Sequence, residues 1–350
     1  MHGDDDVHTA KWFMSLAKTL IWILLGAALI TDRRKFCDAF ISYFSMLSLW
    51  PLTVGFMLYA AHRSPARFAV AYLTIFLLTF RKNAQNTGLG IWSQLGGGWT
   101  GDSIRRFLQA KIQIPYLLEI QSLAAEGKRF VFAVHPHAVF ATSTLVHFVL
   151  SRLSTKEKLG GNIDFRVMTI NLNFFIPLLR EWLLARGFVS ADPETIGCLA
   201  SRGISTVVVP GGSEEALHAY EGSADLIVKK RRGFIREALK AGSWLVPIYA
   251  FGDTESVPVV RSEKILRVQR CIQKAITFAT PFALPYFSRR SPLIMVVGAP
   301  LPPPISGTLE DRVDIYQRDY LNALKNLFNE YVHTYGTASE KRGRGIRFVK

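Results

Sequence analysis

Short apolar runs alternate with stretches of helical period from about residue 100 onward. The runs are rich in β-branched and aromatic residues, and they span residues 130–134, 165–170, 206–209, 245–250 and 293–297. An unbroken apolar run of this length is typical of a strand buried on both faces, as in a parallel sheet. Its alternation with helical segments predicts an α/β fold with a mixed or mostly parallel sheet flanked by helices.

Two of the intervening stretches show where their helices begin. At residues 192–203 an Asp-Pro pair precedes the expected helix and a glycine follows it. Residues 308–311 have the spacing of a capping box and open a helix that we expect to reach Tyr335. The apolar positions expected to form its buried stripe are Val313, Tyr320, Leu324, Leu327, Phe328 and Tyr331.

Segments that are almost free of charge are concentrated before Phe80, at residues 19–30, 40–61 and 68–80. Such composition is typical of a segment that meets lipid. We interpret residues 40–80 as a hydrophobic hairpin that either spans the bilayer or dips into it and returns. Residues 19–30 are shorter than the roughly 20 residues of a spanning helix, so an interfacial helix is an equal alternative there.

Basic residues orient this hairpin. Three lie at residues 33–35 and two at residues 81–82, against two in the turn at residues 62–67. The positive-inside rule then places both ends of the hairpin in the cytosol. We therefore expect a membrane-associated region at residues 1–90 and a cytosolic domain at residues 91–350.

The formal net charge of +15 excludes few partners by itself. No recognisable nucleic-acid module occurs in the sequence, and the basic residues lie beside apolar segments and at the C-terminal end. This placement favours an anionic lipid surface or a polyanionic substrate and argues against nucleic acid. The isolated cysteines Cys37, Cys198 and Cys271 indicate a reducing compartment and no metal site.

Two histidines stand where the apolar run at residues 130–134 ends, in the order His135-Pro136-His137. Ligands of open α/β sheets bind beyond the carboxyl ends of the strands, so this is a candidate catalytic position. Side chains alternate along an extended chain, which predicts that the two rings point in different directions and that one of them is the base. The alternative is that both rings only hydrogen-bond to loop backbone.

A second candidate stretch runs from a strand through Gly211 and Gly212 to Glu215. Glycines let a substrate approach the backbone, and the N–H groups of Gly211 and Gly212 are candidates for an oxyanion site. Glu215 lies one turn into the following helix, where its carboxylate could orient a histidine of the neighbouring strand. The alternative is that the glycines only make the turn and that the glutamate only complements the helix dipole.

Two further stretches complete the candidate chemistry. The basic run at residues 229–232, with Arg231 near its end and Gly233 after it, lies at a helix entrance. It is either a phosphate clamp or a solvated or lipid-facing patch. The strand at residues 245–250 runs into a glycine and two carboxylates, the second of which is Glu255. We expect all four stretches to lie on successive strand ends of one sheet.

These motifs together resemble the type-2 diacylglycerol acyltransferase family, which includes monoacylglycerol acyltransferases and some wax synthases. The residues that carry the resemblance are His135-Pro136-His137, Asn173-Phe174, Pro177, Leu179-Arg180-Glu181, Thr195-Ile196, Pro210-Gly211-Gly212, Glu215-Ala216-Leu217, Arg231, Gly233-Phe234, Val246-Pro247, Phe251-Gly252 and Glu255. The resemblance runs from about the hairpin to Tyr335. The chain departs from the family at Ala138, where glycine is usual, and an alanine there would narrow the pocket or alter substrate choice.

The resemblance implies an acyl-CoA-dependent O-acyltransferase that makes triacylglycerol from diacylglycerol in the endoplasmic reticulum membrane and on lipid droplets. It implies that His137, His135 and Glu215 are catalytic. It also implies that the substrate-binding residues are Pro136, Gly211, Gly212, Arg231, Gly233, Asn173 and Glu255. Acyl-CoA is then a co-substrate, no other cofactor is expected, and a homo-oligomer stays open.

The residue types suit direct attack of the acceptor hydroxyl on the thioester. A thiol with a pKa of about 8.5 leaves readily, so the main task is to activate the alcohol, which an imidazole can do. Other acceptors, a monoacylglycerol or a long-chain alcohol, remain open, and so does a non-enzymatic lipid-transfer or tethering role. A glycerol-phosphate-type acyltransferase is disfavoured because Phe140 and Thr142 stand where those enzymes have aspartate.

Overall fold

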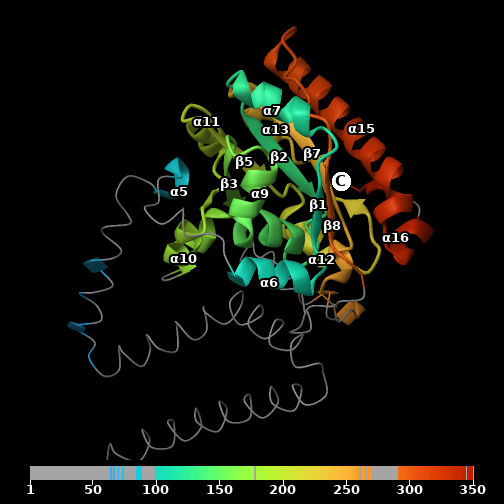
Figure 1. Ribbon diagram of the computed structural model, residues 1–350, viewed down its shortest axis with the longest axis horizontal. Helices are drawn as coiled ribbons and strands as arrows, with labels where there is room; N and C mark the ends of the chain where they lie inside the picture. The colour runs from blue at the N-terminus through green and yellow to red at the C-terminus, as the bar shows by residue number, and fades with distance from the viewer. Residues whose placement is uncertain are drawn as a thin grey trace, which may run out of the picture.

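A computed structural model describes residues 84–88, 99–176, 179–257, 291–343 and 345–349, with isolated residues between 64 and 74 and between 259 and 269. The described chain forms a seven-stranded sheet with helices on both faces (Figure 1). The predicted hairpin at residues 40–80 and the segment at residues 19–30 lie outside the described residues, apart from those isolated positions. Within the described part of the chain, no helix has both the length and the apolar composition needed to cross a membrane.

The sheet is mixed and mostly parallel, as predicted. Its strands are β1 (Lys111–Gln113), β2 (Phe130–His135), β3 (Asp164–Thr169), β4 (Phe188–Ser190), β5 (Ile204–Val208), β7 (Trp244–Phe251) and β8 (Ile294–Val297), in the order β1-β8-β7-β2-β5-β3-β4. Neighbouring strands pair in parallel except β7 and β8, which are antiparallel. The five predicted strands are all present, whereas the two short edge strands, β1 and β4, have no apolar run that predicts them.

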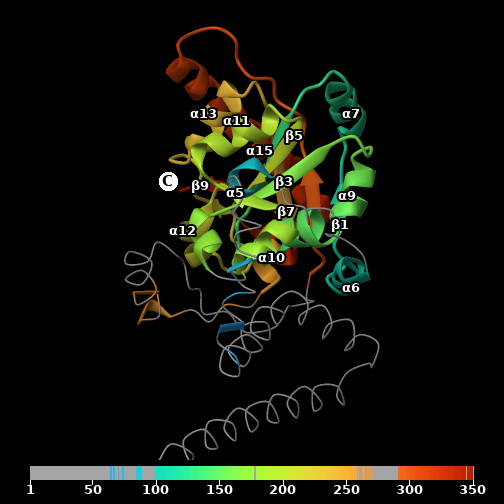
Figure 2. The ribbon, with the colours of Figure 1, turned by 90° about the vertical axis from the view of Figure 1, so that its left-hand side faces the viewer.

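Alternate residues of β2 enter two separate cores, because successive side chains of a strand point to opposite faces. Val131 and Ala133 pack with α11 (Pro193–Ala200), α13 (Gly233–Lys240) and α15 (Leu309–Tyr335). Phe132 and Val134 pack on the other face. In Figure 2, α11 and α13 lie to the left of β5, whereas α7 and α9 lie to its right.

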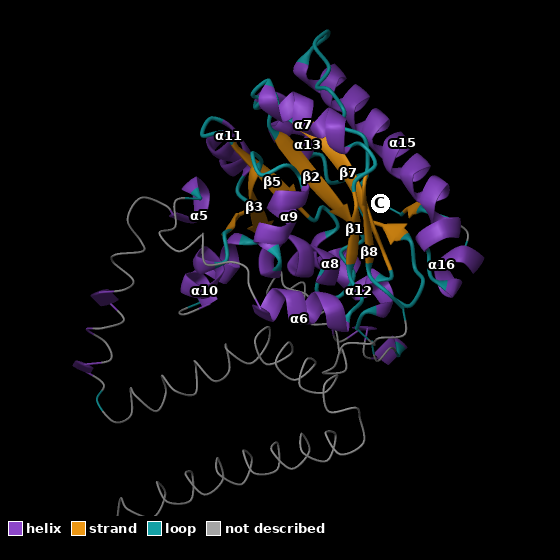
Figure 3. Cartoon of the chain, in the orientation of Figure 1, coloured by secondary structure: helices purple, strands orange, loops and turns teal. Residues whose placement is uncertain are grey.

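The helices of the second face follow β1 and β2. They are α7 (Leu117–Ala125), α8 (Thr142–Thr144), the π-helical turn η2 (Leu145–Leu150) and α9 (Arg152–Lys158). The remaining helices are α5 (Ala84–Thr87), α6 (Trp99–Phe107), η3 (Asn171–Phe175), α10 (Leu179–Ala185), α12 (Gly212–His218), η4 (Asp253–Glu255) and α16 (Ala338–Arg342). Both α8 and α12, which follow β2 and β5, lie at the lower end of the sheet in Figure 3.

The C-terminal helix α15 begins at the predicted capping box. The Thr308 hydroxyl accepts a hydrogen bond from the Asp311 N–H at 3.3 Å, and the Asp311 side chain accepts one from the Thr308 N–H at 3.1 Å. The stripe predicted for this helix is buried apart from Tyr331, which is only partly covered, and Tyr316 and Val332 join it. The helix therefore lies against the same face of the sheet that receives the side chain of His135.

Candidate active site

Three of the four candidate stretches meet at one edge of the sheet. His135 ends β2, the Gly211-Gly212 turn follows β5, and Gly252 follows β7. These strands are parallel neighbours in the order β7-β2-β5, so their carboxyl ends lie together. The expectation was wrong for the basic run, because it follows β6 (Asp225–Leu226), which pairs with β9 (Arg347–Phe348) in a separate two-stranded sheet.

His135 is fully enclosed beneath α15. Its side chain has no solvent exposure, and its Nε2 lies 2.8 Å from the hydroxyl oxygen of Tyr320. Burial, and then the nearby ring of His137, lower the pKa of His135 to about 3. Because both effects disfavour the charged ring, His135 is neutral at physiological pH. Because its side chain has no solvent exposure, the ring is also closed to a substrate hydroxyl.

His137 lies beyond the end of β2, after a cis peptide bond between His135 and Pro136, and its side chain is half-buried. Its Nδ1 lies 3.1 Å from the carbonyl oxygen of Ala138, which can only accept a hydrogen bond. The proton of the neutral ring is therefore on Nδ1, and Nε2 keeps its lone pair. Burial lowers the pKa of His137, which favours this unprotonated form.

Glu215 holds the backbone of His137 rather than its ring. Its side chain is 2% exposed; Oε1 accepts a hydrogen bond from the His137 N–H at 2.5 Å and Oε2 accepts one from the Ile227 N–H at 2.8 Å. Our expectation that this carboxylate orients the histidine ring is corrected, because the carbonyl oxygen of Ala138 is the group that contacts Nδ1. Burial raises the pKa of Glu215 to about 7, although the two N–H groups favour its charged form.

The paired glycines shape the turn around this carboxylate. A Cβ at Gly211 would lie 2.3 Å from the carboxyl group of Glu215, so only glycine admits the glutamate. Gly212 has a φ of +60°, in the region that favours glycine. These glycines therefore do make the turn. Their N–H groups as an oxyanion site remain a prediction.

Ala138 has the backbone conformation for which glycine is suited. Its φ is +47° and its side chain is 1% exposed. For a residue with a Cβ, left-handed backbone costs roughly 1–2 kcal/mol. This explains in physical terms why glycine is favoured at this position, and it shows that the alanine methyl is enclosed by the protein.

The two carboxylates after β7 have different partners. The oxygens of Asp253 accept hydrogen bonds from the N–H groups of Thr142 and Ser143, at 3.1 and 3.0 Å, where α8 begins. This capping role has no signal in the sequence, because the two segments are far apart along the chain. Glu255 accepts a hydrogen bond from the Ser291 hydroxyl at 2.5 Å. The edge that carries His137 is thus joined to its neighbouring helix by Asp253.

The basic run is divided between two neighbours. The guanidinium of Arg231 lies 3.5 Å from the carboxylate of Glu214 on α12, and its side chain is 44% exposed. Arg232 instead pairs with Asp314 on α15, and Arg236 pairs with Glu310 at 2.7 Å. Arg231 is therefore the arginine of this group that faces the helix carrying Glu215.

Asn173 and Gly233 are less closely tied to the site. Asn173 lies in η3 after β3, two strands from β2 on the same sheet edge, and its amide donates a hydrogen bond to the Thr169 hydroxyl at 2.9 Å. Gly233 opens α13, and a Cβ there would contact nothing within 4 Å. The structure gives no geometric reason for a glycine at position 233.

Tyr320 is the site residue that sequence reasoning missed. It was assigned only to the buried stripe of the C-terminal helix, yet its hydroxyl reaches His135. A buried tyrosine usually finds a hydrogen-bond partner for its hydroxyl, and this was the one available signal. The identity of the partner is visible only in the fold.

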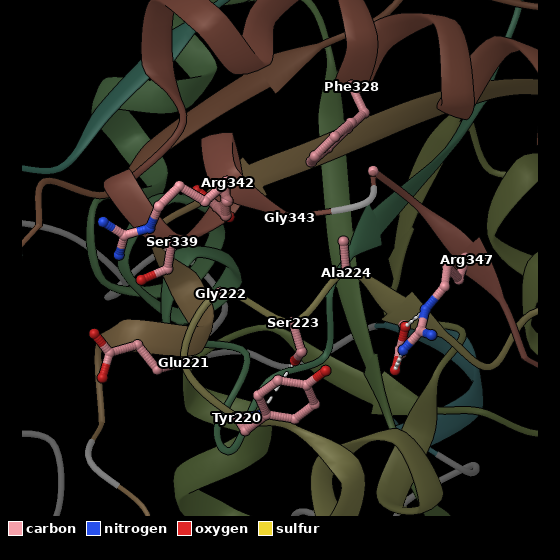
Figure 4. A pocket seen from close by; sticks show the side chains of 13 residues that line it. Tyr220, Glu221, Gly222, Ser223, Ala224, Phe328, Ser339, Arg342, Gly343 and Arg347 are labelled. Atoms are coloured by element: carbon pink, nitrogen blue, oxygen red, sulfur yellow. Dashed lines mark hydrogen bonds and ion pairs between the residues drawn. The ribbon is translucent and has the colours of Figure 1, made fainter.

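A separate pocket of about 360 Å³ lies between the loop that precedes β6, α15, α16 and β9 (Figure 4). None of the predicted site residues lines it. Glu340 in its wall accepts hydrogen bonds from the N–H groups of Thr337, at 2.8 Å, and Gly252, at 3.3 Å. Arg347, at another side, pairs with Asp225 at 2.6 Å. This pocket therefore does not include His137.

Comparison with known proteins identifies similar chains. A sequence model of the diacylglycerol acyltransferase family matches residues 104–342. Acyl-CoA wax alcohol acyltransferase 1 of Homo sapiens is 29% identical over 318 residues, which cover 86% of this chain and 88% of that protein. Diacylglycerol O-acyltransferase 2 of Dictyostelium discoideum is 31% identical over 232 residues, 62% of this chain and 70% of the other.

Two more similarities complete the comparison. For 2-acylglycerol O-acyltransferase 1 of Mus musculus, the identity is 28% over 311 residues, 83% of this chain and 89% of that protein. Among solved structures, a 1-acyl-sn-glycerophosphate acyltransferase from Thermotoga maritima matches with a TM-score of 0.43 and 11% identity, over 87% of this chain and 99% of that one.

Proposed function

Because this chain belongs to the diacylglycerol acyltransferase family and is an acyltransferase, we propose that it transfers the acyl group of acyl-CoA to the hydroxyl of diacylglycerol. The product is triacylglycerol. The observation that carries this proposal is the contact between Nδ1 of His137 and the Ala138 carbonyl oxygen at 3.1 Å, which assigns the ring proton to Nδ1. An unprotonated Nε2 at the carboxyl edge of the sheet is what an alcohol acceptor requires.

His137 is the general base, and His135 is not. The ring of His135 is enclosed and its Nε2 is occupied by Tyr320, whereas His137 is half-buried at the sheet edge. General base catalysis by a positioned side chain contributes typically 10²–10⁴-fold to the rate. Removing the ring of His137 should therefore cost about that factor.

The reaction is a direct transfer. Nε2 of His137 takes the proton of the acceptor hydroxyl. At the same time the hydroxyl oxygen attacks the carbonyl carbon of the thioester, and a tetrahedral intermediate forms. The carbon–sulfur bond then breaks, the thiolate of coenzyme A leaves, and the proton on His137 passes to that sulfur. The N–H groups of Gly211 and Gly212 stabilise the developing oxyanion; that of Gly212 makes only a long bond, 3.4 Å, to the Val209 carbonyl.

The substrates approach this edge from different sides of the site. Arg231, on the α12 side, binds a phosphate of acyl-CoA, since a guanidinium can grip a phosphate with two parallel hydrogen bonds. Asn173 and Glu255 lie at the same sheet edge, after β3 and β7, and line the path of the acceptor. Acyl-CoA, the acceptor lipid and a bilayer are the partners that this function requires.

The proposed location is the endoplasmic reticulum membrane, with the site facing the cytosol, and lipid droplets. It is supported by the charge-free segments before Phe80 and by the basic residues that flank them. A monoacylglycerol or a long-chain alcohol is the second candidate acceptor. It is supported by the relatives named 2-acylglycerol O-acyltransferase and wax alcohol acyltransferase, which match more than 80% of this chain.

The test is product formation from labelled acyl-CoA, with diacylglycerol, monoacylglycerol and a long-chain alcohol supplied in turn. We expect triacylglycerol as the main product and a loss of at least about 100-fold in His137→Ala. His333→Ala is the matched control, because His333 is an exposed histidine on α15. Activity of His137→Ala within a few-fold of wild type would remove His137 as the base. Absence of transfer to every acceptor would favour a lipid-transfer or tethering role.

A further inference from the structure

The hydrogen bond between Tyr320 and His135 joins two segments that are 185 residues apart. Both side chains have no solvent exposure. The aromatic ring of Tyr320 is also packed edge-on against Phe234, with centroids 5.7 Å apart. The hydroxyl is thus held at a fixed place on the sheet, directly at the end of the strand that leads to His137.

A second tyrosine one helical turn earlier shows what an ordinary structural role looks like on the same helix. The hydroxyl of Tyr316 accepts a hydrogen bond from the Leu245 N–H at 2.8 Å and lies 3.0 and 2.9 Å from the carbonyl oxygens of Ser243 and Leu301. Its partners are all backbone groups at the amino end of β7. Tyr320 differs because its hydrogen-bond partner is a side chain of the candidate active site.

We propose that Tyr320 is a positioning residue for acyl transfer, which holds the neutral ring of His135 and thereby fixes the turn that presents His137. This inference rests on the proposed function for its catalytic consequence. Pro136 has no N–H, so the hydrogen bonding of the strand cannot continue through the turn. The turn is then tethered at His135 by Tyr320 and at the His137 N–H by Glu215.

The tether also suits the charge that develops in the reaction. His137 becomes positively charged when it takes the hydroxyl proton, and a charged His135 beside it would oppose that step. Tyr320 binds His135 through an uncharged hydroxyl. Burial and then the charge of Glu215 raise the pKa of Tyr320 well above its usual value, so the hydroxyl stays protonated. His137 is the titratable neighbour that acts on the pKa of His135, and Tyr249 is paired with His135 in the register of β2 and β7.

Tyr320→Phe keeps the packing against Phe234 and removes the hydroxyl alone. Nε2 of His135 then has no partner, in a ring whose Nδ1 already has none among the described residues. We expect kcat to fall by about 10-fold or more, with both KM values within about two-fold of wild type. We also expect the acid limb of kcat/KM to move to higher pH, because a loosened turn exposes His137 to water and its pKa returns toward about 6.5.

The matched control is Tyr316→Phe, which loses more hydrogen bonds. It should lower the thermal midpoint but leave kcat per folded enzyme and the acid limb unchanged. A double-mutant cycle with His135→Gln distinguishes the two tyrosines, because the free-energy effects of substitutions at two residues that interact do not add. In the Tyr320→Phe/His135→Gln double variant, the fold-loss in kcat should be smaller than the product of the two single losses. In the Tyr316→Phe/His135→Gln double variant, the fold-loss in kcat should equal that product. A simple product for the Tyr320 pair would overturn the proposal.

Hydrogen exchange gives a readout that does not need activity. Amides between residues 137 and 142 should exchange faster in Tyr320→Phe, and those at residues 243–245 should exchange faster in Tyr316→Phe. If the wild-type protein transfers no acyl group, the proposed function fails while the exchange result still decides the tether. Unchanged exchange at residues 137–142 in Tyr320→Phe would overturn the inference even in an active enzyme.

Discussion

Glu215→Gln changes one oxygen of a buried carboxylate into an amide group and leaves the shape of the side chain unchanged. In the wild-type protein both oxygens accept backbone hydrogen bonds, from the N–H groups of His137 at 2.5 Å and Ile227 at 2.8 Å. A glutamine offers one acceptor oxygen and one NH₂ group, which cannot accept. Whichever way the amide turns, one buried N–H faces another donor and the remaining bond loses its charge.

The size of the effect follows from these two bonds. A buried donor left without an acceptor costs about 1–3 kcal/mol of the free energy of unfolding. If about 1–2 kcal/mol of this cost appears as a higher activation free energy, because His137 is held less well in the transition state, kcat falls by a factor of about 5–30. This is less than the loss expected for His137→Ala, because Glu215 positions the base and does not carry the proton.

Glu340→Gln is the matched control. Glu340 is also buried, accepts two backbone hydrogen bonds and has a pKa that burial raises to about 7, but its partners are Thr337 and Gly252. Both variants should unfold more easily in denaturant, because each leaves a buried N–H without an acceptor, and only Glu215→Gln should lower kcat. Full kcat in Glu215→Gln despite lost stability would refute the positioning role, and a loss larger than that of His137→Ala would make Glu215 the proton carrier.

The same variant has a signature in the pH dependence of stability. The pKa of Glu215 is raised by burial from 4.5 to about 7, so the folded protein keeps a proton that the unfolded chain has lost. The stability that this proton contributes is present below pH 4.5 and is lost as pH rises through about 7. Glu215→Gln should remove this contribution to the change in the free energy of unfolding between pH 4.5 and 7.

Three further predictions concern residues around His137. Ala138→Gly should change the free energy of unfolding by less than about 1 kcal/mol in a denaturant titration. Relief of the positive φ is offset there by the loss of a buried methyl group and by the greater entropy of the unfolded chain. In the same titration, Ala138→Val should lower the free energy of unfolding by more than about 2 kcal/mol. A pH–rate profile should show kcat/KM falling below pH 6.5, since burial lowers the pKa of His137 and only its unprotonated form is active; a midpoint above 6.5 would contradict this. In micelle titrations, Arg231→Gln should raise the KM for acyl-CoA and leave the KM for the acceptor unchanged. The control Arg236→Gln, which loses an ion pair with Glu310, should change neither KM. An unchanged KM for acyl-CoA in Arg231→Gln, together with weaker binding to anionic vesicles, would assign Arg231 to the membrane.

The apolar runs and helix signals were enough to predict the central strands, the parallel character of the sheet and the start of α15. These features depend on residues close together in sequence: a run such as residues 130–134 is apolar throughout because both faces of β2 are covered, and the capping box at Thr308 is complete within one turn. The position of His135 and His137 at a carboxyl edge follows from the same reasoning. The short edge strands β1 and β4 have too few residues to show a pattern.

Which partner each polar side chain takes was decided only by the tertiary structure. Glu215 contacts the backbone of His137 because α12 packs at the end of β2, and Arg232 contacts Asp314 because α13 lies beside α15. Tyr320 shares the spacing of its core neighbours along the helix, and only the docking of α15 places its hydroxyl 2.8 Å from His135. Hydrophobic periodicity specifies which face of an element is buried, but a hydrogen bond depends on positions to within a few tenths of an ångström, which the packing of distant segments sets.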